Sequence, residues 1–224
     1  PEDLEDRAKG FGAIKVIVDD LSDEFVSNYV FPMFRCNTLY EGEYLLGTAI
    51  ARPLIAKRLV EIANQEGTNF IAHGATGKGN DQIRFEMGAH ALNSEIQVIA
   101  PWREWDLSSR TDLMNYCKEN QIPMPASKAE EPPFSMDENL LHISYEGGVL
   151  EDLSTPPPED MWLKVKSIEK ANSEPETINI KFQNGDPVAI NDNALTDAEI
   201  LKNLNDLGCA HGIGRIDIVF FICY

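Results

Sequence analysis

Short runs of β-branched residues alternate with helical patterns over the first half of the chain, and this alternation limits the possible folds more than any other feature. The predicted strands are residues 13–18, 69–73 and 95–100. The predicted helices are residues 25–33, 53–66, 80–91 and 109–120. Such alternation predicts an α/β fold with an open, mostly parallel sheet and helices on both faces. Ligands of such sheets bind outside the carboxyl ends of the strands.

Helix-ending residues refine these boundaries. Ser22 is a candidate cap for the first helix, and Pro32 is expected to end or bend it. Pro53 suits the first turn of the second helix, and Gly67 suits its end.

The composition changes near Pro123, where prolines and charged residues predict a linker over residues 123–133. The region that follows is predicted to be α+β. Its expected elements are a strand at 177–182, a helix at 195–207 with Thr196 as its cap, and a strand at 216–222. The sequence thus predicts two domains, residues 1–126 and residues 127–224.

Charge and cysteine spacing exclude several classes of function. The net charge of −18 disfavours nucleic acid and anionic membranes as partners, while 43% hydrophobic residues allow a real core. The sequence has no signal-peptide pattern and no apolar run long enough to span a bilayer. Widely spaced cysteines without a Cys-x-x-Cys pair indicate a reduced, cytoplasmic protein without a metal site: Cys36, Cys117, Cys209 and Cys223.

A glycine-rich segment, His73-Gly-Ala-Thr-Gly-Lys-Gly-Asn-Asp81, lies between a predicted strand and a predicted helix. It is not a P-loop, because Lys78 is followed by glycine rather than by serine or threonine. Glycines let backbone amides approach a ligand, and they adopt positive φ where amides must converge. Asn80 or Asp81 can cap the next helix, whose amino end favours an anion.

Asp81 and Arg84 are three residues apart and can face one pocket from the first turn of that helix. The guanidinium of Arg84 suits a carboxylate, and the carboxylate of Asp81 suits an ammonium group. This pair therefore predicts a site for a zwitterionic amino acid. The alternative is a capped, glycine-rich turn with a surface ion pair of little energetic weight.

Five segments, in order along the chain, closely resemble the argininosuccinate synthase family. They are residues 44–53, 73–86, 99–103, 135–146 and 211–219. The resemblance covers nearly the whole chain, from Pro1 to about Val219. It implies a sheet of the ATP pyrophosphatase (adenine nucleotide alpha hydrolase-like) type, followed by part of an α+β synthetase domain.

The resemblance also implies a reaction and its binding residues. Family members are ATP-dependent ligases of arginine biosynthesis that join citrulline and aspartate through a citrullyl-adenylate, without a covalent enzyme nucleophile. ATP enters as its magnesium complex, no tightly bound cofactor is expected, and the complete protein is expected to be a homotetramer. By resemblance, Gly74 lies against ATP, and the aspartate-binding residues are Thr48, Thr76, Asn80 and Asp81. The implied citrulline-binding residues are Tyr44, Asn80, Arg84, Ser135 and Ser144.

Structural roles remain open for several of these residues. Tyr44 can be an ordinary half-buried aromatic, and Ser144 can belong to a plain strand. Ser135 precedes Glu138 by three residues, which is a capping-box pattern. Structural roles are also expected for the histidines His73, His142 and His211.

Family members normally begin with a Ser-Gly-Gly-x-Asp-Ser loop that holds the pyrophosphate end of ATP, and this sequence contains no such segment. We therefore expect a piece of a longer protein that alone binds ATP poorly and turns over little. Two other hypotheses stay open. One is a non-catalytic remnant with residual amino-acid binding. The other is a different ATP pyrophosphatase, such as a tRNA-modifying enzyme, which the negative charge disfavours.

Overall fold

The computed structural model describes residues 4–76, 79–107, 110–122 and 134–218. The α-helices are α1 (Leu4–Gly10), α2 (Ser22–Phe25), α3 (Phe31–Arg35), α4 (Gly47–Gln65), α5 (Asp81–Leu92), α6 (Arg110–Glu119) and α7 (Asp197–Ala210). The strands are β1 (Phe70–Ala72), β2 (Gln97–Ile99), β3 (Ser135–Glu138), β4 (Ile143–Glu146), β5 (Ile180–Gln183), β6 (Asp186–Ile190) and β7 (Asn193–Ala194). A π-helical turn (Val26–Val30) joins α2 to α3, and short 3-10 turns occupy Pro101–Arg103, Gly148–Glu151 and Glu159–Met161.

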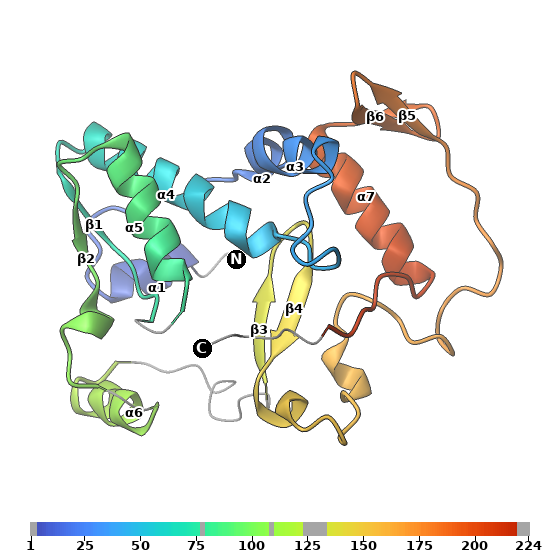
Figure 1. Ribbon diagram of the computed structural model, residues 1–224. Helices are drawn as coiled ribbons and strands as arrows, with labels where there is room; N and C mark the ends of the chain where they lie inside the picture. The colour runs from blue at the N-terminus through green and yellow to red at the C-terminus, as the bar shows by residue number, and fades with distance from the viewer. Residues whose placement is uncertain (1–3, 77–78, 108–109, 123–133, 219–224) are drawn as a thin grey trace.

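Strands β1 and β2 are parallel, with α5 as the connection between them, which confirms the predicted parallel pairing. Helices α4 and α5 pack closely beside this pair (Figure 1). Gly88 permits the close approach, because a Cβ there would lie 3.1 Å from the Cβ of Ala56. The buried side chains between these elements, which we call the α4–α5 cluster, are Val60, Ala63, Ile71, Ala89 and Ile96.

The predicted strand at residues 13–18 is wrong. This segment has no strand structure, and Ile14 and Val18 are exposed. A β-branched run becomes a strand only where a neighbouring strand pairs with its backbone. Within the described residues, no strand pairs with this segment, and the parallel part of the sheet consists of β1 and β2.

Helix boundaries predicted from proline positions differ from those of the structure. Helix α4 begins at Gly47 and continues through Pro53, which the sequence placed at its start. Pro32 does not end the helical run, which continues to Arg35; it lies in the first turn of α3, directly after the π-helical turn. Ser22 does not cap α2; its backbone N–H donates to the Asp20 carboxylate at 2.9 Å.

Glycine predicted the end of α4 correctly. Gly67 follows the helix with φ 68°. Its N–H donates to the Asn64 carbonyl and the Thr68 N–H donates to the Ala63 carbonyl, which together form a Schellman motif. The predicted helices at 80–91 and 109–120 are confirmed by α5 and α6.

The second half contains small antiparallel sheets and one long helix. Strands β3 and β4 form a hairpin, and β5, β6 and β7 form a three-stranded sheet. Thr196 caps α7 as predicted: its hydroxyl accepts from the Glu199 N–H, and the Glu199 carboxylate accepts from the Thr196 N–H. Residues 216–218 are not in a strand, and the rest of the strand predicted at 216–222, like the linker 123–133, lies outside the described residues.

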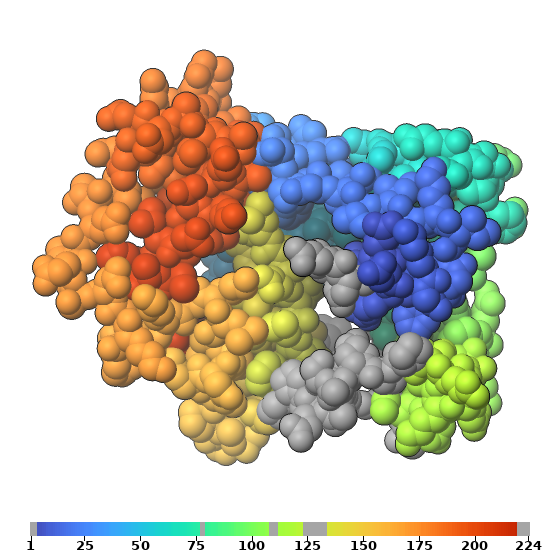
Figure 2. All heavy atoms as spheres, turned by 180° about the vertical axis from the view of Figure 1, so that it is seen from behind, coloured from blue at the N-terminus to red at the C-terminus, as the bar shows by residue number. Residues whose placement is uncertain are grey.

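A second set of buried side chains joins α7 to the N-terminal helices and α4. We call it the α2–α7 cluster; it consists of Phe25, Val26, Val30, Phe31, Leu54 and Leu201. Helix α4 extends from the β1–β2 pair toward the β3–β4 hairpin (Figure 1). From behind, the hairpin (yellow) lies between the N-terminal segment (blue) and the α7 segment (orange-red) (Figure 2). The amino end of α4 thus meets the second half of the chain.

Candidate functional site

The glycine-rich segment begins where β1 ends, at the carboxyl edge of the parallel pair. Gly74, Thr76 and Asn80 are all exposed. A Cβ at Gly74 would have no heavy atom within 4 Å, so its backbone can be approached closely. The expected positive φ is not found at Gly74 or Gly79, and Gly77 and Lys78 lie outside the described residues.

Neither predicted cap of α5 acts through its side chain. Asn80 occupies the N-cap position, but its side chain makes no capping hydrogen bond. Asp81 is the first helical residue, and arginines bind its carboxylate instead.

His73 fastens the start of the glycine-rich segment to α5. Its Nδ1 accepts the N–H of Ala75 at 3.2 Å, so Nε2 carries the proton, and Nε2 lies 3.3 Å from Glu86 Oε1. Arg103 binds the same Glu86 carboxylate at 2.8 Å, and the His73 ring stacks on Phe85. The internal role expected for His73 is therefore confirmed.

Asp81 lies between two arginines. Its Oδ2 accepts from Nε of Arg52 at 3.0 Å and from Nη2 of Arg52 at 2.9 Å. Its Oδ1 accepts from Nη1 of Arg84 at 2.8 Å. The side chains of Arg52, Asp81 and Arg84 are 17%, 33% and 31% exposed, so the group is half-buried. The structure thus brings Asp81 and Arg84 together as predicted, and adds Arg52.

The β3–β4 hairpin brings Asp137 to the same group. Nη2 of Arg52 also donates to Asp137 Oδ2 at 2.9 Å, and the Thr48 hydroxyl donates to the same oxygen at 3.0 Å. Thr48 and Arg52 are four residues apart on α4 and therefore share a face. Asp137 therefore connects Thr48 and Arg52 of α4 to the hairpin.

Ser135 and Ser144 lie on the same face of the hairpin as Asp137. Ser135 precedes Asp137 by two residues in β3, and Ser144 of β4 is directly opposite Asp137. Ser135 is in a strand, so the capping-box interpretation of Ser135 and Glu138 is wrong, because it required a helix. Both serines therefore adjoin the arginine–carboxylate group, which consists of Arg52, Asp81, Arg84 and Asp137.

The hairpin turn supports the amino end of α4 through His142. Its Nε2 accepts the Gly47 N–H at 3.0 Å, and Tyr44 packs edge-on against its ring at 5.2 Å between centroids. Burial lowers the pKa of His142 from its ordinary value of 6.5, and the Asp137 charge and a backbone contact with Leu45 oppose part of that shift. A neutral ring fits this geometry, because a protonated Nε2 could not accept the Gly47 N–H. This contact also places Tyr44 at the Thr48 end of α4.

Sequence reasoning missed Arg52 and Asp137. Both lie inside the segments quoted for the family resemblance, and simple spacing connects them to predicted residues. Arg52 follows Thr48 by one helical turn, and Asp137 follows Ser135 by two strand positions. Those spacings could have found them, if α4 had been predicted to begin at Gly47.

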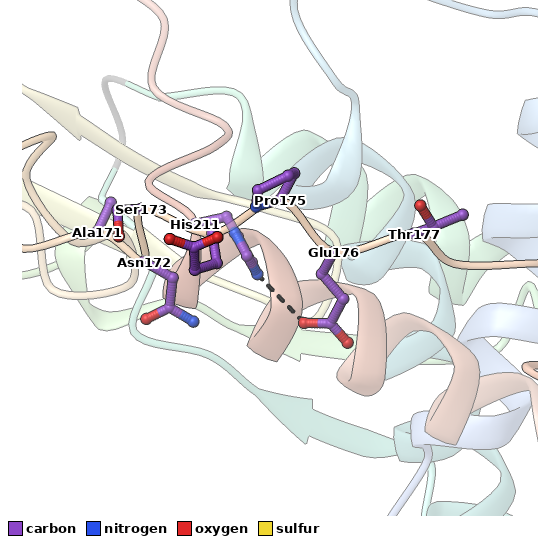
Figure 3. A pocket seen from close by; sticks show the side chains of 8 residues that line it. Ala171, Asn172, Ser173, Pro175, Glu176, Thr177 and His211 are labelled. Carbon is purple, nitrogen blue, oxygen red and sulfur yellow. Dashed lines mark hydrogen bonds and ion pairs between the residues drawn. The ribbon is translucent and has the colours of Figure 1, made fainter.

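Two surface hollows of the described residues lie away from the predicted site residues. One of about 720 Å³ is lined by residues 171–177 and His211. There Glu176 Oε2 lies 3.2 Å from His211 Nε2 (Figure 3). Another of about 450 Å³ lies between α7 and the β6–β7 strands. His211 is the C-cap of α7, which agrees with its expected structural role.

Family models match almost the whole chain. Residues 2–123 match the arginosuccinate synthase N-terminal HUP domain, and residues 134–220 match the arginosuccinate synthase C-terminal domain. The chain belongs to the argininosuccinate synthase family. This result confirms the resemblance of the five sequence segments.

Curated members of the family are similar over nearly all of this chain. The argininosuccinate synthase of Saccharophagus degradans is 58% identical over 214 residues, which cover 95% of this chain and 52% of the relative. The enzyme of Nitratiruptor sp. is 60% identical over 204 residues, which cover 91% of this chain and 50% of the relative. The chain therefore spans about half the length of the curated relatives it matches.

Three further observations concern the thiols, metal-ligating groups and helices of the described residues. Cys36, Cys117 and Cys209 are free thiols. Within residues 4–76, 79–107, 110–122 and 134–218, no group of three or more His, Cys, Asp or Glu side chains could hold a metal ion. No helix in those same ranges is long and apolar enough to cross a bilayer.

Proposed function

We propose that this protein is an ATP-dependent ligase that joins citrulline and aspartate to form argininosuccinate, with release of AMP and pyrophosphate. The observation that supports it most is the arginine–carboxylate group of Arg52, Asp81, Arg84 and Asp137 beside the glycine-rich segment. Family membership supports the same reaction.

The reaction has two displacement steps. The ureido oxygen of citrulline attacks the α-phosphorus of ATP, and pyrophosphate leaves. The amine of aspartate, after losing a proton, then attacks the ureido carbon, and AMP leaves with the oxygen. Such chemistry depends mainly on positioning the reactants and stabilising developing charge, not on an enzyme nucleophile.

We assign the binding roles as follows. ATP, as its magnesium complex, lies against Gly74 with its metal carried by the phosphates. Aspartate contacts Thr48, Thr76, Asn80 and Asp81. Citrulline contacts Tyr44, Asn80, Arg84, Ser135 and Ser144. Thr48 and Arg52 both donate to Asp137, and Arg52 and Arg84 both donate to Asp81, which supports a single site for both amino acids.

We further propose that the complete protein is a cytoplasmic homotetramer. Its nucleotide-binding domain, with a parallel sheet of the ATP pyrophosphatase type, occupies residues 1–126 of this chain. A partial synthetase domain occupies residues 127–224. Nucleic acid and membranes are not proposed partners, because the chain is strongly acidic. Free cysteines support a reducing compartment.

Calorimetric titration with citrulline and with aspartate tests the proposal on this chain. We expect both amino acids to bind. Replacing Arg84 by glutamine should weaken citrulline binding roughly tenfold or more, because a charge-assisted hydrogen bond is lost. Arg58→Gln is the matched control on α4, where Arg58 pairs with Asp19 and Glu61 away from the site. If the wild-type chain binds neither amino acid, the proposal is wrong and the chain is a folded domain without this binding site.

A further inference from the structure

The two carboxylate oxygens of Asp81 accept different numbers of hydrogen bonds. An ionised carboxylate offers about four acceptor positions, two on each oxygen. Oδ2 accepts two N–H groups from Arg52, whereas Oδ1 accepts one from Arg84. One acceptor position therefore remains within the described contacts, and it lies on Oδ1, next to the Arg84 guanidinium.

Arg52 also fixes where that carboxylate stands relative to the hairpin. Its Nη2 donates to Asp81 Oδ2 and to Asp137 Oδ2, both at 2.9 Å. Arg52 is the least exposed member of the group, at 17%. One guanidinium thus joins α4, α5 and β3.

We propose that Arg52 is a positioning residue of the amino-acid site. By filling Oδ2 of Asp81 it leaves Oδ1 as the acceptor for the amino group of aspartate, and through Asp137 it holds the hairpin serines beside that acceptor. Arg52 touches neither substrate in this assignment. The inference rests on the proposed function, and it adds a residue to which that function gave no role.

The proposal depends on the shape of the guanidinium and not only on its charge. Nε and Nη2 together contact Asp81 Oδ2, while Nη2 also reaches Asp137. A lysine ammonium is a compact charge on a flexible stem and cannot reproduce this fork. Arg52→Lys should therefore fail to restore what Arg52→Gln loses.

Calorimetry of aspartate binding to this chain tests the proposal. We expect Arg52→Gln to weaken aspartate binding at least about tenfold, and Arg52→Lys to recover only part of the loss. Asp137→Asn should have a smaller effect, because the Arg52–Asp81 contact remains. The matched controls are Arg58→Gln and Arg58→Lys. Arg58 lies six residues after Arg52 on α4 and also donates to two carboxylates, those of Asp19 and Glu61. Both control variants should leave aspartate binding unchanged.

The NMR resonance of the Arg52 Nε–H gives a second measurement. It is made on the wild-type chain, so it does not depend on whether a variant folds. In the wild-type chain, this proton should exchange slowly with water, and its resonance should shift when aspartate is added. The Nε–H of Arg58 should not shift.

The outcomes separate this inference from the proposed function. If wild type binds aspartate and Arg52→Gln binds it equally well, the positioning role is overturned while the ligase assignment stands. An Arg52→Lys variant that matches wild type overturns it as well, because charge alone would then suffice. If wild type binds neither amino acid, the proposed function fails and the positioning role fails with it.

Discussion

The two hydrophobic clusters of this chain are assembled from very different parts of the sequence. The α4–α5 cluster draws all its buried residues from a continuous stretch between Val60 and Ile96. The α2–α7 cluster joins side chains near residue 30 to Leu201. The first is a local β–α–β packing unit, whereas the second closes a loop of most of the chain, which carries a larger entropic cost.

Helix α4 belongs to both clusters. Leu54 lies in the α2–α7 cluster, and Val60, six residues later on the helix, lies in the α4–α5 cluster. The site residues Thr48 and Arg52 precede both on the same helix. The candidate site therefore depends on a helix held by a local unit at one end and by distant contacts at the other.

The largest expected effect comes from removing a large buried side chain from the α2–α7 cluster. Phe31 is 1% exposed, and Phe31→Ala should lower the free energy of unfolding by about 3–5 kcal/mol, from lost burial and a residual cavity. Hydrogen exchange should show faster opening of α7 with little change in α5. Chemical denaturation would give the stability and amide exchange would give the location.

Phe34→Ala is the matched control, because Phe34 lies on the same helix but is 43% exposed. It should cost far less. If Phe31→Ala opened α5 as fast as α7, the two clusters would form one cooperative unit, and the distinction between them would be wrong.

The next effect arises outside both clusters, where α4 meets the hairpin. A Cβ at Gly47 would lie 2.4 Å from Asn139 Oδ1 and 2.8 Å from His142 Cδ2. Asn139 cannot yield easily, because its Oδ1 accepts the N–H groups of Leu141 and His142. Gly47→Ala should therefore cost about 1–3 kcal/mol by thermal unfolding, and should also weaken amino-acid binding.

Gly10→Ala controls for the general effect of removing a glycine. Gly10 ends α1, and an added Cβ there would meet nothing within 4 Å. It should leave both stability and ligand binding nearly unchanged. A Gly47→Ala variant as stable as wild type would show that the hairpin does not press on α4.

These contrasts show which parts of the fold the sequence could predict. Helix α5, the β1–β2 strands and the capped start of α7 follow from local patterns of burial, glycine and threonine, so they were predictable. The segment 13–18 was not, because its β-branched composition fits a strand while pairing depends on a neighbour. The start of α4 was missed because Pro53 suits a first helical turn yet here lies inside the helix.

The sequence could predict one contact of the candidate site, but not the contacts that join it to the hairpin. Family resemblance and spacing gave Asp81 with Arg84, and the structure brings them together. Arg52 and Asp137 could not be paired from sequence, because their contact spans 85 positions and depends on the hairpin docking at α4. The substrate roles of all the predicted binding residues, Asp81 and Arg84 included, stay predictions.

A smaller effect is expected at the start of α7, which affects only one end of the α2–α7 cluster. Thr196→Ala removes the hydroxyl that accepts the Glu199 N–H at 3.3 Å. The loss should be about 1 kcal/mol in the free energy of unfolding, measured by denaturant titration. Thr196→Ser keeps the hydroxyl and should retain most of the stability. Equal losses for both variants would show that the methyl group, not the cap, matters.

The smallest effect is expected from protonation of His142, because the Asp137 charge offsets part of the burial cost. Since the folded-state pKa lies below the ordinary value of 6.5, the unfolded chain binds the proton more readily. This contribution to stability is complete above pH 6.5 and is lost as the pH falls toward the folded-state pKa. His142→Gln, whose amide oxygen can still accept the Gly47 N–H, should reduce that loss between pH 6.5 and 5 in unfolding experiments. His90→Gln alters an exposed histidine of α5 and should leave the pH dependence as in wild type. If His142→Gln kept the full pH dependence, protonation of this ring would not loosen the junction between α4 and the hairpin, and acid would have to act on other titratable groups.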